Sequence, residues 1–155
     1  MVQITRRSVV AASTAAAALA GGAAAAPKGD HNVAVERFEL TPSVRGIPRI
    51  SYAVARGDMV YVSGVTASPG AKGDVADQTL QALTRIDELL AKAGTDKSKL
   101  LSATIWLTDM ANFAAHNDAW NSWVDQANPP ARACLASPQL WRPNLLVEVM
   151  VTAFR

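Results

Sequence analysis

Residues 129–148, PPARACLASPQLWRPNLLVE, contain two apolar segments that each carry one charged side chain. Arg132 is surrounded by alanine, cysteine and leucine, and Glu148 by leucine, valine and methionine, so both segments are predicted to be strands. Burying a guanidinium or a carboxylate is costly unless the group finds a partner. The two charges therefore lie either on the exposed face of an edge strand or in a binding site. In a site, the planar arginine suits a small carboxylate ligand, and the glutamate can orient a water molecule.

The sequence that precedes this stretch predicts two helices. The first covers residues 75–93, where apolar residues recur at helical spacing, with Asp74 to cap the helix and Gly94 to end it. The second covers residues 111–127, and its tryptophans are interpreted as core or subunit contacts rather than as a ligand platform.

The other apolar segments predict strands, and Gly57-Asp58 supplies a tight turn between two of them. The predicted strands are residues 33–40, 52–56, 59–64 and 100–107, the segment around Arg132, and residues 145–154. The order β–ββ–α–β–α–β–β predicts an α+β fold in which two helices pack on one face of a mixed sheet. Because the strands carry apolar side chains on both faces, the other face is expected to pack against a partner subunit.

The N-terminal segment, residues 1–26, has the pattern of an export signal. Arg6 and Arg7 precede a short, alanine-rich apolar run that ends in an A-x-A pattern. This predicts a signal peptide of the twin-arginine type, a periplasmic location and a mature domain of residues 27–155. The apolar run is too short for a membrane-spanning helix, so no membrane association is expected after the signal is removed. The alternatives are an uncleaved or disordered tail and a misplaced start codon.

Composition and motif content exclude several classes of function. Without the leader, the count of Lys and Arg falls from 15 to 13 and equals the 13 Asp and Glu, so nothing supports nucleic-acid binding. The single cysteine, Cys134, excludes an internal disulfide. The sequence has no metal-binding Cys/His spacing and no glycine-rich phosphate loop, so neither a metal nor a cofactor is expected. His116 is interpreted as a surface or packing residue, and Cys134 as a small buried side chain rather than a nucleophile.

Short motifs spread over residues 33–155 carry a resemblance to a known family. They are Ser63-Gly64 after the hairpin, Asp77-Gln78-Thr79 with Ala82-Leu83, Thr104 with Leu107-Thr108-Asp109-Met110 and Phe113, Asn117 with Trp120, Pro130-Ala131-Arg132-Ala133-Cys134, and Leu145-Leu146-Val147-Glu148-Val149. This set resembles the RidA family, the YjgF-like group of enamine/imine deaminases. The resemblance does not extend to the leader.

The resemblance implies a chorismate-mutase-like α+β subunit that forms a homotrimer with ligand clefts between subunits. It also implies hydrolysis of 2-aminoacrylate-like imino acids to 2-keto acids and ammonia without a cofactor. Arg132 would bind the substrate carboxylate and Glu148 would hold the attacking water. The same resemblance assigns the rest of the substrate pocket to Tyr52, Gly64, Asn117 and Cys134.

Three departures from the family pattern leave alternatives open. Ile50-Ser51 stands where active members commonly have Gly-Pro, and Met150 stands where many carry a second acid. The loop of residues 137–144 is one residue longer than the pattern and includes Trp141. One alternative is therefore a non-catalytic trimeric protein that binds a small acid, and another is hydrolysis of a different C–N bond.

Overall fold

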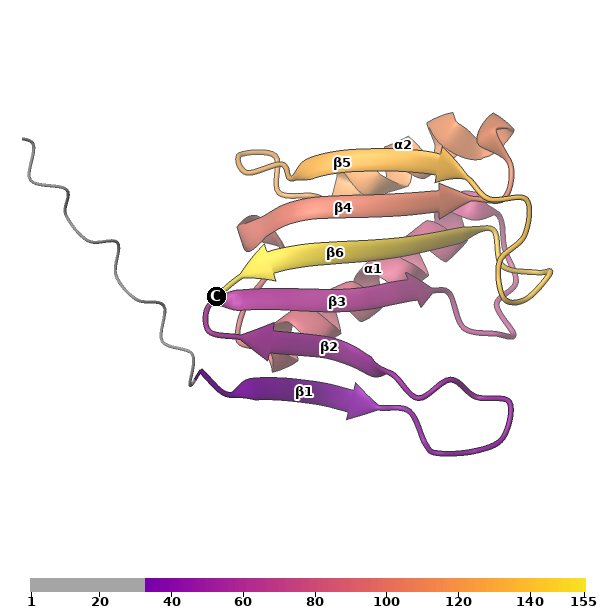
Figure 1. Ribbon diagram of the computed structural model, residues 1–155. Helices are drawn as coiled ribbons and strands as arrows, with labels where there is room; N and C mark the ends of the chain where they lie inside the picture. Colours follow the sequence, from indigo (N-terminus) through magenta and orange to yellow (C-terminus); the bar gives the residue numbers. More distant parts are fainter. Residues whose placement is uncertain (1–32) are drawn as a thin grey trace, which may run out of the picture. The chain divides into compact units, whose positions relative to one another are not determined.

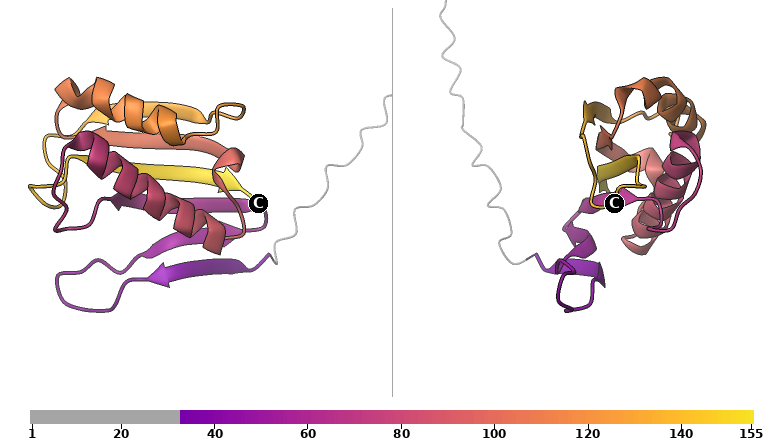
Figure 2. Two further views of the ribbon diagram at one scale, coloured as in Figure 1. Left: turned by 180° about the vertical axis from the view of Figure 1, so that it is seen from behind. Right: turned by 90° about the vertical axis from the view of Figure 1, so that its right-hand side faces the viewer.

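The computed structural model describes residues 33–155 and shows a six-stranded β-sheet with both α-helices on the same face (Figures 1 and 2). The strands are β1 Val35–Leu40, β2 Ser51–Arg56, β3 Met59–Thr66, β4 Leu100–Leu107, β5 Ala131–Ala136 and β6 Val147–Phe154. The helices are α1 Val75–Lys92 and α2 Phe113–Trp123, with 3-10 turns at Lys97–Lys99 and Met110–Asn112. The predicted element order and α+β class are confirmed. The predicted signal peptide, residues 1–26, lies outside the described residues.

Strand β6 lies inside the sheet although it is last in the sequence. The strand order is β1-β2-β3-β6-β4-β5, and all neighbours are antiparallel except β4 and β5, which are parallel. Helix α2 connects these two parallel strands across one face of the sheet, as a β–α–β crossover requires (Figure 2). This topology places Arg132 on the edge strand β5 and Glu148 on the inner strand β6.

The hydrophobic core lies between the sheet and the helices. Helix α1 contributes one face of fully buried side chains, Leu83, Ile86, Leu89 and Leu90. Strand β6 contributes every second residue, and the buried ones are Val147, Val149, Val151 and Ala153. Since side chains alternate along a strand, the residues between them, including Glu148, point to the face without helices.

Local chemistry determines where α1 begins and ends. The Asp74 carboxylate accepts hydrogen bonds from the backbone N–H groups of Ala76 and Asp77 at 2.9 and 3.0 Å. At the other end Gly94 adopts a φ of 81°, which a residue with a side chain rarely tolerates. The helix predicted for residues 75–93 is therefore confirmed to within one residue.

The second helix is shorter than predicted because aspartate side chains bind the backbone at both ends. Asp109 accepts from the N–H of Ala111 at 2.8 Å and caps a 3-10 turn, so α2 begins only at Phe113. Beyond Trp123, Asp125 accepts from the N–H groups of the two residues after Gln126 at 2.8 and 3.0 Å, forming a turn. These local bonds replace helical ones, and the prediction of residues 111–127 is wrong at both ends.

Strand β6 also begins later than predicted, at Val147 instead of residue 145. A buried glutamine of α1, Gln78, donates to the carbonyl of Asn144 at 3.0 Å and accepts from the N–H of Leu146 at 2.9 Å. The side chain thus takes the place of a neighbouring strand for this segment. These bonds attach the end of the 137–144 loop to the helix.

The face of the sheet opposite the helices carries exposed apolar side chains. Tyr61 of β3, Leu135 of β5 and Met150 of β6 are each 40–50% exposed. Their strand partners Thr152, Trp106 and Thr104 share this face, because residues paired directly across a ladder point the same way. The partner subunit expected to cover this face stays a prediction. Within residues 33–155, neither helix is long and apolar enough to cross a membrane.

Candidate active site

Glu148 lies over a glycine in a locally distorted part of β3. The pairing of β3 with β6 changes from Val62↔Val151 to Val65↔Val149, so β3 contains one extra residue at Ser63–Gly64, a β-bulge. A Cβ atom at Gly64 would lie 1.9 Å from Oε1 of Glu148. The carboxyl group therefore occupies the space that a side chain at this position would fill. The structure brings together two predicted site residues, Gly64 and Glu148.

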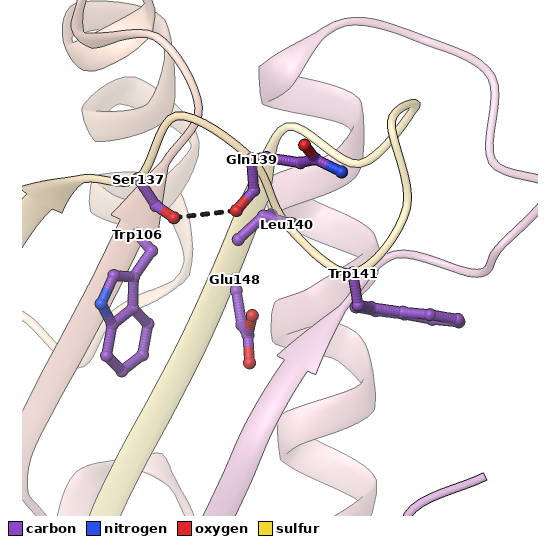
Figure 3. A pocket seen from close by; sticks show the side chains of 6 residues that line it. All are labelled: Trp106, Ser137, Gln139, Leu140, Trp141 and Glu148. Atoms are coloured by element: carbon purple, nitrogen blue, oxygen red, sulfur yellow. Dashed lines mark hydrogen bonds between the residues drawn. The ribbon is translucent and has the colours of Figure 1, made fainter. Parts of the chain in front are cut away.

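A shallow pocket of about 260 Å³ opens beside this carboxyl group (Figure 3). Its lining residues are Trp106, Ser137, Gln139, Leu140, Trp141 and Glu148. Trp106 is the direct cross-strand neighbour of Glu148, and the 137–144 loop passes over the other side. The indole N–H of Trp141 donates to the hydroxyl of Thr66 at 3.4 Å, while its side chain stays 58% exposed. The 137–144 loop thus forms part of the wall around Glu148.

The Glu148 carboxyl group is half-buried and unpaired. Within residues 33–155 no group donates a hydrogen bond to it and no cation forms an ion pair with it. Burial alone raises its pKa above the usual glutamate value of 4.5. A carboxylate with a raised pKa is a stronger base, and its free oxygens can accept hydrogen bonds from a water molecule.

Arg132 lies on β5 against helix α2. Its Nη2 donates to Nε2 of His116 at 2.6 Å, and its Cζ lies 4.9 Å from the ring centroid of Trp120. Its Nε is buried and has no hydrogen-bond partner within residues 33–155. Burial lowers the pKa of Arg132, but a guanidinium remains protonated at neutral pH. The edge strand thus does carry Arg132, but the side chain packs under a helix instead of extending into solvent.

His116 is the residue whose contact with Arg132 the sequence did not reveal. It is fully buried on α2, and its Nδ1 lies 2.9 Å from the hydroxyl of Thr79 on α1. Burial and the nearby charge of Arg132 lower the pKa of His116 to about 4, so the ring is neutral at pH 7. Of the two interpretations, surface or packing residue, the burial of the ring excludes the surface one. The spacing of His116, four residues before Trp120, is the one signal in the sequence that could have placed it on the buried face of the helix.

The other predicted pocket residues lie in different surroundings. Cys134 is half-buried on the same face of β5 as Arg132, and burial raises the pKa of its thiol, which disfavours the nucleophilic thiolate. Asn117 follows His116 on α2, and its Oδ1 is buried without a hydrogen-bond partner within residues 33–155. Tyr52 lies beneath the guanidinium of Arg85 on α1, with 5.6 Å from Cζ to its ring centroid, and it does not line the Glu148 pocket.

Arg132 and Glu148 lie on opposite faces of the sheet. Arg132 pairs with Ala103 of β4, and Glu148 pairs with Trp106 of the same strand. Positions 103 and 106 are an odd number of residues apart and therefore point to opposite faces, and so do their partners. Within a single chain, the two charges therefore do not face a common small ligand.

Among residues 33–155, no group of three or more His, Cys, Asp or Glu side chains is arranged to hold a metal ion. The structure presents two separate sets of candidate site residues, one on each face of the sheet. One is the Glu148 set, formed by Glu148, Gly64, Trp106 and the 137–144 loop. The other is the Arg132 set, formed by Arg132, His116, Trp120 and Cys134.

Fold and side chains together define a small α+β domain with candidate site residues on both faces of one mixed sheet. The chain belongs to the RidA/YjgF family: its residues 43–155 match the family model described as Endoribonuclease L-PSP. It is 39% identical over 105 residues to a RutC family protein of Haemophilus ducreyi, covering 68% of this chain and 88% of the relative. It is 38% identical over 105 residues to the RutC family protein YoaB of Escherichia coli, covering 68% and 90%.

Solved structures show the same fold. A member of the YjgF protein family from Neisseria meningitidis is 34% identical, with a TM-score of 0.72, and the match covers 81% of this chain and 98% of that one. A member of the YjgF family from Mycobacterium tuberculosis is 26% identical, with a TM-score of 0.69 and coverage of 79% and 100%. The resemblance to the RidA/YjgF family inferred from the motifs is confirmed.

Proposed function

We propose that the protein hydrolyses reactive 2-imino acids, formed from 2-aminoacrylate-like enamines, to 2-keto acids and ammonia. The observation that carries this proposal is the unpaired, half-buried Glu148 carboxylate above Gly64, whose pKa is raised by burial. Such a group can hold a water molecule and accept its proton. Family membership supports the same reaction class.

The two sets of side chains have complementary roles in this reaction. The Arg132 guanidinium binds the substrate carboxylate, and the Glu148 carboxylate accepts a proton from water as the water oxygen forms a bond to the imine carbon. The substrate reacts as its protonated imine, so its C=N π electrons move to nitrogen and give a neutral carbinolamine. The protonated Glu148 then returns its proton to the amino nitrogen. The C–N bond breaks as the hydroxyl oxygen forms the carbonyl, and the hydroxyl proton passes to Glu148 and from there to the departing ammonia. The reaction consumes only water, so it requires no cofactor.

We further propose that the site forms between copies of the chain in a homotrimer. Arg132 and Glu148 lie on opposite faces of one sheet, so a single chain does not present both to one small ligand. The exposed apolar face that carries Glu148 offers a surface for a second copy, which would supply the arginine. Sedimentation of the purified chain as a monomer would contradict this arrangement.

The decisive experiment is the release of ammonia and keto acid from imino acids generated in place by an amino-acid oxidase. The purified protein should accelerate this release above the spontaneous rate. Saturable binding of keto acids without any acceleration would instead support the non-catalytic binding protein. Acceleration only with substrates that contain a different C–N bond would support an altered specificity at the 137–144 loop.

Gly64→Ala is expected to lower imino-acid turnover by about a hundredfold, because the new methyl group would displace the Glu148 carboxyl from its position. The kcat and KM of the variant can be measured in the oxidase-coupled assay. Gly70→Ala is the matched control, since a Cβ there meets no atom within 4 Å. Equal turnover by wild type and Gly64→Ala would show that the position of Glu148 is not important for the reaction.

The N-terminal twin-arginine pattern is the basis of a separate proposal, export to the periplasm. Replacement of both Arg6 and Arg7 by Lys is expected to retain the protein in the cytoplasm at full length. Cell fractionation and mass determination of the wild type and the variant test this. An identical distribution of both proteins would contradict the proposal.

A further inference from the structure

Four residues form a chain of hydrogen bonds in which the position of each proton can be assigned. The hydroxyl of Thr79 lies 2.7 Å from the carbonyl oxygen of Val75 and 2.9 Å from Nδ1 of His116. A carbonyl oxygen only accepts, so the single hydroxyl proton is donated to Val75. The Thr79 oxygen must then accept from His116, which places a proton on Nδ1. Nε2 of the neutral ring consequently carries a lone pair, and Arg132 Nη2 donates to it at 2.6 Å.

This chain of bonds fixes the Arg132 guanidinium in two ways. The first is the hydrogen bond to His116, which acts within the guanidinium plane. The second is a cation–π contact with the ring of Trp120, whose centroid lies 4.9 Å from Cζ. His116 itself cannot turn, because it is fully buried and bonded at both nitrogens. Within residues 33–155, Nη1 and Nε of Arg132 have no hydrogen-bond partner. These groups remain for a ligand.

We propose that His116 is a positioning residue, whose neutral, Nδ1-protonated ring orients Arg132 toward the carboxylate of the ligand without neutralising the arginine charge. An aspartate or glutamate in this position would also orient the guanidinium, but it would form an ion pair and compete with the ligand. A neutral acceptor provides orientation and leaves the positive charge available. The inference rests on the proposed function, because it assumes that Arg132 binds the ligand carboxylate.

Two variants separate positioning from packing. In His116→Gln the amide oxygen can reach the place of Nε2 and still accept from Arg132, whereas His116→Asn can bond Thr79 but is too short to reach the arginine. Pyruvate is the probe, and its binding to each variant is measured by calorimetry. His116→Asn is expected to bind pyruvate about tenfold more weakly than His116→Gln, the effect of losing one hydrogen bond to a charged group. The melting temperature is measured for both, because removal of a buried ring affects both proteins.

Equal weakening of pyruvate binding in the two variants would overturn the positioning role and leave His116 as a packing residue. A second, independent test is the ¹⁵N chemical shift of the imidazole at pH 7. The wild-type imidazole signal that is absent from the spectrum of His116→Gln belongs to His116. Its chemical shifts should be those of an Nδ1–H tautomer. An Nε2–H tautomer would place a proton between His116 and Arg132, and would overturn the proposal without reference to any ligand.

Arg132→Ala distinguishes the failure of this inference from the failure of the proposed function. If Arg132→Ala binds pyruvate as tightly as wild type, Arg132 is not the carboxylate-binding group and the proposed function fails. If Arg132→Ala loses pyruvate binding while His116→Asn retains it, only the positioning role fails. Loss of affinity in both, with His116→Gln close to wild type, is the expected result.

Discussion

Arg132→Ala is expected to lower kcat/KM for imino acids by about a hundredfold or more. Removing one partner of a charge-assisted pair costs about 2–5 kcal/mol, and a bidentate guanidinium–carboxylate pair also orients the substrate. The orientation is lost together with the affinity, so both kcat and KM should change. The oxidase-coupled release of ammonia and keto acid measures both.

The variant requires two controls because Arg132 also contacts buried groups. Alanine leaves Nε2 of His116 without its donor, which costs about 1–3 kcal/mol of stability. Arg132→Lys retains the positive charge but lacks the planar fork, and should lose most of the activity with less effect on packing. Arg56→Ala, at the exposed end of β2, should retain wild-type turnover. Wild-type turnover by a folded Arg132→Ala would eliminate the proposed role of the arginine.

Glu148→Gln is expected to lower kcat by about 10²–10⁴-fold, the range that a positioned general base contributes. The amide has nearly the same shape and lies in the same place over Gly64, but it cannot accept a proton from water. Wild-type turnover should fall as the pH decreases through the pKa of Glu148, which burial raises above 4.5. This acidic limb should be absent from the residual activity of the variant.

As the pH rises through the pKa of Glu148, the free energy of unfolding should fall while turnover increases. The unfolded Glu148 carboxyl titrates near 4.5 and the folded one at higher pH, so between these values the folded protein holds more protons. The free energy of unfolding therefore falls as the pH rises through this window, and the loss is complete above the folded pKa. Glu148→Gln removes this loss and should be at least as stable as wild type at pH 7. Denaturant unfolding at several pH values tests this.

Glu88→Gln is the matched control for both measurements. Glu88 is exposed on α1 and forms an i,i+3 pair with Arg85, so its replacement should leave turnover unchanged and alter stability by well under about 1 kcal/mol. A Glu148→Gln variant that keeps wild-type turnover would exclude Glu148 as the base. It would leave the unpaired carboxylate without a catalytic role, and the binding-protein alternative would then be favoured.

Local signals in the sequence were sufficient for helix α1 and for the hairpin between β2 and β3. Helix α1 has a continuous apolar face, an aspartate cap and a terminal glycine, and each acts within one turn of the chain. The hairpin between β2 and β3 depends on Gly57, whose φ of 61° suits a tight turn. The ends of α2 and β6 were predicted less well. The start of β6 depends on Gln78, which is 68 residues away from its partner Leu146. The ends of α2 depend on local bonds to Asp109 and Asp125, which the spacing of apolar residues does not indicate.

The sequence by itself determined the element order, the α+β class, and the two charges, Arg132 and Glu148, that do not fit their apolar strands. Only the tertiary structure decided where those charges point. Strand β6 enters the sheet between β3 and β4, and this pairing sets Arg132 and Glu148 on opposite faces. The contact of His116 with Arg132 likewise depends on how α2 packs over β5. The physical reason is that the face of a side chain follows from strand register and helix packing, which join residues far apart in the chain.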